Sequence, residues 1–76
     1  MKDQIRGIVQ EFARGTVPED TAVDLIESGI IDSLAIMSIF TALEDDFDIR
    51  IDGDDISKDN FQSVDTMAGL IEKCRK

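Results

Sequence analysis

The fold is decided by one stretch of the sequence, DSLAIMSIFTALEDDF, at residues 32–47. This stretch contains no proline or glycine, and either Asp32 or Ser33 can cap a helix that continues from Leu34 to Phe47. Apolar residues recur along it at helical spacing and form one stripe, which we assign to the core: Ile36, Ile39, Phe40, Leu43 and Phe47. The pattern therefore predicts an amphipathic helix as the central element.

The same helix carries a second, shorter stripe that starts beside Ser33. Leu34 and Met37 form it, and Thr41 follows one turn later. A helix in a small protein needs to bury only one face, so a second apolar stripe requires its own explanation.

Two more long helices flank the central one. Toward the N-terminus, apolar residues at i, i+3, i+4 and i+7 predict a helix that we expect to end at Gly15; they are Ile5, Ile8, Val9 and Phe12. Toward the C-terminus, Ser63 can cap a last helix, whose expected buried stripe is Val64, Met67, Ala68, Ile71 and Cys74. Its C-terminal end carries basic residues, which suit the helix dipole: Lys73, Arg75 and Lys76.

The connections between these helices are less regular. Residues 16–32 form a long connection, which six apolar side chains can anchor to the core: Val17, Val23, Leu25, Ile26, Ile30 and Ile31. Residues 48–56 are acidic, with Gly53 at a turn, and we expect a short helical turn near Asp55 to Asp59. The sequence thus predicts an all-α protein, a small four-helix bundle of three main helices plus one short helix, in a single domain over residues 1–76.

Composition excludes several classes of function. The 76 residues include no histidine, so Ser–His–Asp and Cys–His units and histidine-containing zinc sites are excluded. The net charge of −9 disfavours nucleic acid and anionic membranes, and residues 19–65 hold fourteen acids against two bases. We see no signal peptide or membrane span, and the single cysteine, Cys74, favours a reducing, cytoplasmic setting.

One hydroxyl stands out as a candidate site. Ser33 lies where the long connection meets the central helix, next to Asp32, so it can be accessible and accept a chemical group. The chain offers no histidine and no nearby lysine as a base, so activation of this hydroxyl must come from a second protein.

These residues resemble the acyl carrier protein family, which includes peptidyl and D-alanyl carriers. The tripeptide Asp32-Ser33-Leu34 is similar to the family's attachment motif, and Gly29 precedes it as in the family's loop. Residues 43–51, LEDDFDIRI, look like the family's acidic end of the second helix, and residues 61–64, FQSV, look like the entry into its last helix. The resemblance covers essentially the whole chain.

The resemblance implies a carrier, not an enzyme. A phosphopantetheinyl transferase would move the 4′-phosphopantetheine arm of coenzyme A onto Ser33, with Asp32 helping to orient the complex and Leu34 beside it. The arm's thiol would hold acyl or aminoacyl groups as thioesters for fatty-acid-like, polyketide or other specialised biosynthesis. Partners would be acyl- or aminoacyl-activating and acyl-transferring enzymes with basic patches. We expect a monomer with no catalytic residues and no metal site of its own.

The resemblance also offers an explanation for the second stripe. Apolar residues near Ser33 and acids at the far end of the helix would form a partner-binding face: Leu34, Met37, Thr41, Glu44, Asp45 and Asp46. The alternative is that Met37 packs against the short third helix. Carriers of the common fatty acid synthase usually have acids where this chain has Ala35 and Ser38, which favours a specialised carrier; D-alanyl carriers lack them as well.

The residues fit two other classes of protein poorly. A calcium loop starting at Asp55 fails, because Asn60 replaces the required glycine and Thr66 replaces the bidentate glutamate. Adjacent acids such as Asp45 and Asp46 diverge on a helix, so they are poor acid–base pairs for an enzyme. The remaining alternative is an acidic helical protein without a prosthetic group, which either binds Ca²⁺ at a loose divalent site or acts as an adaptor.

Overall fold

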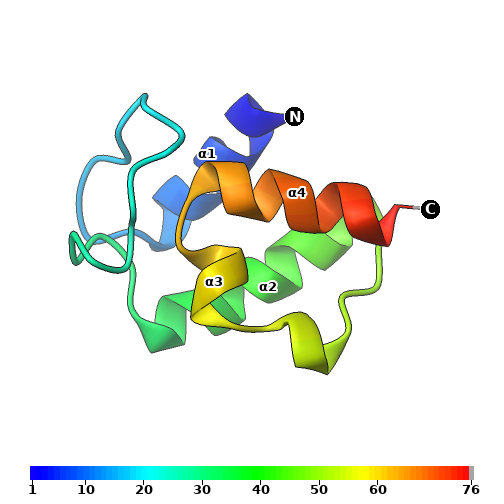
Figure 1. Cartoon of the computed structure of the whole chain (residues 1–76). Coiled ribbons are helices and arrows are strands. Elements are labelled where there is room, and N and C mark those ends of the chain that lie inside the picture. The colour runs from blue at the N-terminus through cyan, green and yellow to red at the C-terminus, as the bar shows by residue number, and fades with distance from the viewer. Residues whose placement is uncertain (76) are drawn as a thin grey trace.

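The computed structural model describes residues 1–75 and is all-helical (Figure 1). Its elements are α1 (Lys2–Phe12), α2 (Ser33–Phe47), the 3₁₀ turn η1 (Gly53–Asp55), α3 (Lys58–Phe61) and α4 (Val64–Cys74). The predicted bundle of three long helices and one short helix is confirmed. Lys76, expected to add to the basic end of the last helix, lies outside the described residues.

The central helix α2 forms as its sequence predicts. Asp32 is its N-cap, and the Asp32 side chain accepts a hydrogen bond from the backbone N–H of Ala35. The helix ends at Phe47 because Asp48 takes a left-handed conformation (φ 52°) and donates its N–H to the carbonyl of Glu44. The predicted core stripe is buried at Ile36, Ile39 and Leu43 and partly buried at its two phenylalanines.

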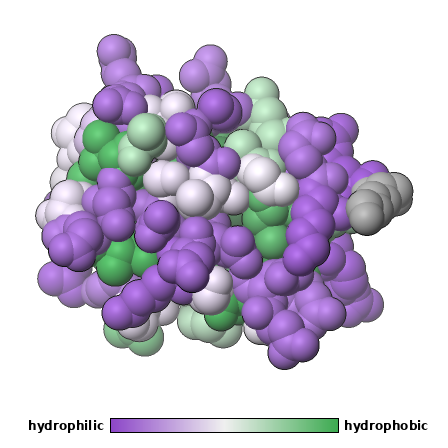
Figure 2. Space-filling view, in the orientation of Figure 1, coloured by the Kyte–Doolittle hydropathy of each residue, from purple (hydrophilic) through white to green (hydrophobic). Residues whose placement is uncertain are grey.

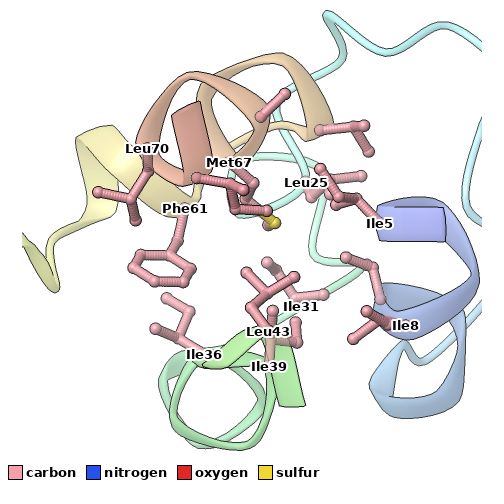
Figure 3. Packing of buried hydrophobic residues seen from close by; sticks show 14 of the residues in the cluster. Ile5, Ile8, Leu25, Ile31, Ile36, Ile39, Leu43, Phe61, Met67 and Leu70 are labelled. Atoms are coloured by element: carbon pink, nitrogen blue, oxygen red, sulfur yellow. The ribbon is translucent and has the colours of Figure 1, made fainter. Parts of the chain in front are cut away.

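A single hydrophobic core lies between the long helices. Figure 3 shows side chains converging on it from α1, α2, α3, α4 and the long connection. Ile5 from α1, Phe61 from α3, and Ile39 and Leu43 from α2 are fully buried. α1 packs against both α2 and α4, while α3 packs against α4. This packing fixes the start of α2 relative to α1, which matters for the site described below.

The long connection before α2 is anchored to the core, as predicted. Val17, Leu25 and Ile31 are buried, whereas Val23 is only half-buried and lies outside the core cluster. The backbone N–H of Leu25 donates to the carbonyl of Gln62 at 2.6 Å, which ties the connection to the start of α4. The residues that lead into α2 are therefore held in place.

The predicted end of the first helix is wrong. α1 ends at Phe12, and Ala13 is already extended (φ −83°, ψ 153°), so Gly15 does not cap it. Tertiary hydrogen bonds draw the chain away there: the N–H of Arg14 donates to the carbonyl of Ile30 at 2.9 Å. Phe12, expected in the core, is 37% exposed.

The short helical segment before α4 differs from the prediction. The single turn expected at residues 55–59 is instead η1 and α3, which are separated because Ser57 is extended and caps α3 through the N–H of Asn60.

In α4, the capping box formed by Ser63 and Thr66 and the predicted buried stripe are present, with Cys74 half-buried. Leu70, which was not predicted to be buried, is only 3% exposed and lies on the same side of the core as Phe61 (Figure 3).

The surface is largely hydrophilic. Figure 2 shows this for the face on which α4 lies, where apolar residues appear in small separate patches. Within residues 1–75, no helix has the length and hydrophobicity needed to cross a membrane.

Candidate functional site

Ser33 is the first residue of α2 and is exposed to solvent. It directly follows Asp32, at the point where the anchored connection ends and the helix begins. The start of a helix carries unpaired backbone N–H groups and a partial positive charge, which favour a phosphate group at this position. An exposed hydroxyl there fits a phosphate ester on its oxygen.

Asp32 is held by hydrogen bonds to both of its carboxylate oxygens. Oδ1 accepts from the N–H of Ala35 at 2.9 Å, and Oδ2 accepts from the guanidinium of Arg14 at 2.7 Å. The hydrogen bond from Ala35 is the main cause that lowers the pKa of Asp32, and the guanidinium of Arg14 lowers it further. Asp32 is therefore an ionised carboxylate at neutral pH, which makes it a weak base for Ser33.

The structure separates the two residues that could have capped the helix. Asp32 makes the capping hydrogen bond, so the hydroxyl of Ser33 is not required for this purpose. The three adjacent residues therefore differ. The carboxylate of Asp32 is held by hydrogen bonds, the hydroxyl of Ser33 is not needed for capping, and the side chain of Leu34 is 81% exposed. The site therefore offers an accessible hydroxyl as a candidate acceptor.

The second stripe of α2 is exposed. Met37 is 53% exposed and lies outside the hydrophobic core cluster. The hydroxyl of Thr41 donates to the carbonyl of Met37 at 3.1 Å, and Thr41 is exposed as well.

A shallow groove of about 560 Å³ extends this surface toward α1. Its lining comes from the end of α1 and one side of α2: Phe12, Met37, Ser38, Thr41, Ala42 and Asp45. Phe12 was missed as a surface residue because helical spacing alone placed it with the core stripe of α1. The sequence carried no local signal for its exposure.

The acids at the far end of α2 have different surroundings. Asp45 and Asp46 are exposed, as expected of a partner-binding face. Glu44 is half-buried, and its carboxylate accepts a hydrogen bond from the N–H of Ile51 at 2.9 Å. Glu44 therefore fixes the connector that follows α2, a structural role that the sequence did not reveal.

The acids that suggested a calcium loop also serve the fold. Asp52 caps η1 through the N–H of Asp54, and Asp55 pairs with Lys73 at 3.0 Å. Across residues 1–75, no group of three or more Asp, Glu or Cys side chains lies close enough together to hold a metal ion.

The chain is similar to known proteins along almost its whole length. Residues 3–71 match the family described as "Phosphopantetheine attachment site". The chain is also similar to the D-alanyl carrier proteins of Bacillus cereus (strain B4264) and Bacillus anthracis (strain CDC 684 / NRRL 3495). Each is 28% identical over 75 residues, a match that covers 97% of this chain and 95% of the relative.

Proposed function

The chain belongs to the family of proteins with a phosphopantetheine attachment site, and on this premise we propose that Ser33 carries the arm on which cargo is presented as a thioester. Covalently attached 4′-phosphopantetheine is the cofactor that membership of this family implies. The observation that supports Ser33 is its exposed hydroxyl at the start of α2, which Asp32 leaves free by capping the helix.

The chain's own residues contribute an acceptor and its surroundings. The oxygen of Ser33 forms a bond to the phosphorus next to the pantetheine of coenzyme A, and the bond from that phosphorus to the nucleotide part breaks. The proton of Ser33 passes to a base of the phosphopantetheinyl transferase, because Asp32 is a weak base. Once attached, the group supplies a thiol on a flexible arm, which raises the effective concentration of its cargo near partner enzymes.

The carrier is proposed to perform no catalytic step itself. We propose one carrier domain over residues 1–76 that acts as a monomer in the cytoplasm, where a reduced Cys74 and arm thiol would persist. Its partners would be the transferase and the acyl- or aminoacyl-activating and acyl-transferring enzymes, which meet its acidic surface with basic patches.

Among cargoes, we favour an aminoacyl group. The relatives are D-alanyl carrier proteins, and the start of α2 has Ala35 and Ser38 in place of the acids usual in fatty acid carriers. With the arm attached, incubation with D-alanine, ATP and a D-alanine-activating ligase should add a D-alanyl group that hydroxylamine removes, as followed by intact mass. Exclusive loading by a fatty acyl- or malonyl-transferring enzyme would instead assign the protein to fatty acid or polyketide synthesis.

The partner-binding face is proposed to include the exposed stripe of α2 and the acids beyond it. Leu34 and Met37 offer apolar contacts next to Ser33, while Asp45 and Asp46 attract basic residues. The groove beside Met37, lined from α1 and α2, is proposed to be part of this face. Glu44 belongs to this face by position, although its carboxylate is held by Ile51.

Replacing Met37 with glutamate tests this face. We expect cargo loading by the activating enzyme to fall about 10-fold or more, because an exposed apolar anchor becomes a charge at a desolvated contact. The free energy of unfolding should change by less than about 1 kcal/mol, since Met37 is 53% exposed. Gln4→Glu, which adds the same charge at an exposed position of α1, should load like the wild type. A large loss of stability in Met37→Glu would show that Met37 belongs to the core.

A further inference from the structure

We propose that Arg14 is a positioning residue for the attachment reaction: it fixes the carboxylate of Asp32 beside Ser33 so that the transferase meets it in one orientation. This inference rests on the proposed function and adds to it a residue outside the attachment motif. Arg14 lies 18 residues before Asp32 in the sequence.

The backbone of Arg14 is held next to the start of α2. After α1 ends at Phe12, the N–H of Arg14 donates to the carbonyl of Ile30 at 2.9 Å. On the other side, the side chain of Gln10 bonds to the carbonyl of Gly15 at 2.8 Å, which holds the turn against α1. The guanidinium therefore starts from a fixed backbone, although the Arg14 side chain is 74% exposed.

The guanidinium completes the orientation of the carboxylate. In capping the helix, Oδ1 of Asp32 accepts a hydrogen bond from the N–H of Ala35. The bond from Arg14 to Oδ2, at 2.7 Å, holds the second oxygen, so the carboxylate cannot rotate freely. A carboxylate oxygen has two lone pairs, so each oxygen still has one available for a reactant or a partner's donor.

The surrounding sequence shows why this cation must come from elsewhere. Residues 19–49, which include the connection and α2, contain no lysine or arginine. The positive charge beside Asp32 therefore comes from Arg14, in the turn after α1. Stability is a poor explanation for the pair, because both side chains are well exposed and such ion pairs contribute little to folding.

The initial rate of loading tests the inference, with coenzyme A, a broad-specificity phosphopantetheinyl transferase and intact mass as the readout. Arg14→Gln should lower kcat/KM about 10-fold, mainly through kcat, because a misoriented group slows the step itself. Arg14→Lys should restore most of the loss, since an ammonium can donate the single bond that Oδ2 accepts. Arg50→Gln, which removes the same charge from an exposed arginine after α2, should match the wild type.

A double-mutant cycle separates positioning from a general structural effect. Asp32→Asn keeps a capping oxygen but removes the charge that Arg14 holds. In the Asp32→Asn background, Arg14→Gln should cause no further loss of kcat/KM. In either background, Arg14→Gln should change the melting temperature of the protein by less than about 5 °C. An equal loss in both backgrounds would overturn the inference in favour of an independent role.

The outcomes also distinguish this inference from the proposed function. If the wild type is loaded and Arg14→Gln loads as fast as Arg50→Gln, the positioning role is wrong and the proposed function stands. If the wild type is not loaded by a transferase that modifies a control carrier, the proposed function itself fails.

Discussion

Phe61→Ala is expected to lower the free energy of unfolding by about 3–5 kcal/mol, the range for removing a buried phenylalanine. Phe61 is fully buried and is one of the largest such side chains in the core. It belongs to the four-residue helix α3, in which it is the one buried residue. A domain of this length has a total stability of about 4–11 kcal/mol, so the variant should lose at least about a quarter of that stability.

Urea unfolding followed by circular dichroism measures this effect, and the chain supplies a matched control. Phe12→Ala removes the same side chain from a position that is 37% exposed, so it should cost much less. The midpoint of Phe61→Ala should therefore lie well below that of Phe12→Ala. Equal midpoints would contradict the packing of α3 into the core.

Ser33→Ala is expected to abolish attachment of phosphopantetheine while leaving the fold unchanged. The reacting oxygen is lost, and alanine offers the transferase no acceptor. Stability should change by less than about 0.5 kcal/mol, because Asp32 rather than Ser33 caps α2. Intact mass after incubation with coenzyme A and the transferase reports the first effect, and thermal unfolding reports the second.

Ser28→Ala is the control for this prediction, since it removes an exposed hydroxyl outside the groove and should load normally. Asp32→Ala is the complementary variant for capping and should cost about 0.5–2 kcal/mol. A loss of stability of that size in Ser33→Ala would mean that serine is the cap. Persistent loading of Ser33→Ala would place the attachment on a different residue.

The elements with strong local signals could be predicted from the sequence. α2 and α4 each combine helical spacing of apolar residues with a capping residue, and both form as expected. The end of α1 could not be predicted, because it depends on the hydrogen bond from Arg14 to Ile30 across the fold. The burial of Leu70 was missed for a similar reason, since α3 extends the core on its side of α4.

In the candidate site, too, features set by neighbouring residues could be predicted, whereas contacts between distant residues could not. Its proposed serine stands out in the sequence because Asp32-Ser33-Leu34 is a local motif followed by a helical pattern. Which of the first two residues caps the helix stayed open, because Asp and Ser cap about equally well. The pairing of Arg14 with Asp32 and of Glu44 with the backbone of Ile51 left no local signal in the sequence.

Counting free thiols after loading tests most directly whether Ser33 carries a thiol-bearing arm. The unmodified chain has one thiol, that of Cys74. After incubation with coenzyme A and a transferase, removal of coenzyme A and denaturation, the wild type should show two thiols and Ser33→Ala should still show the single thiol of Cys74. A wild type that keeps only its Cys74 thiol, alongside a control carrier that gains one, would contradict the proposed function.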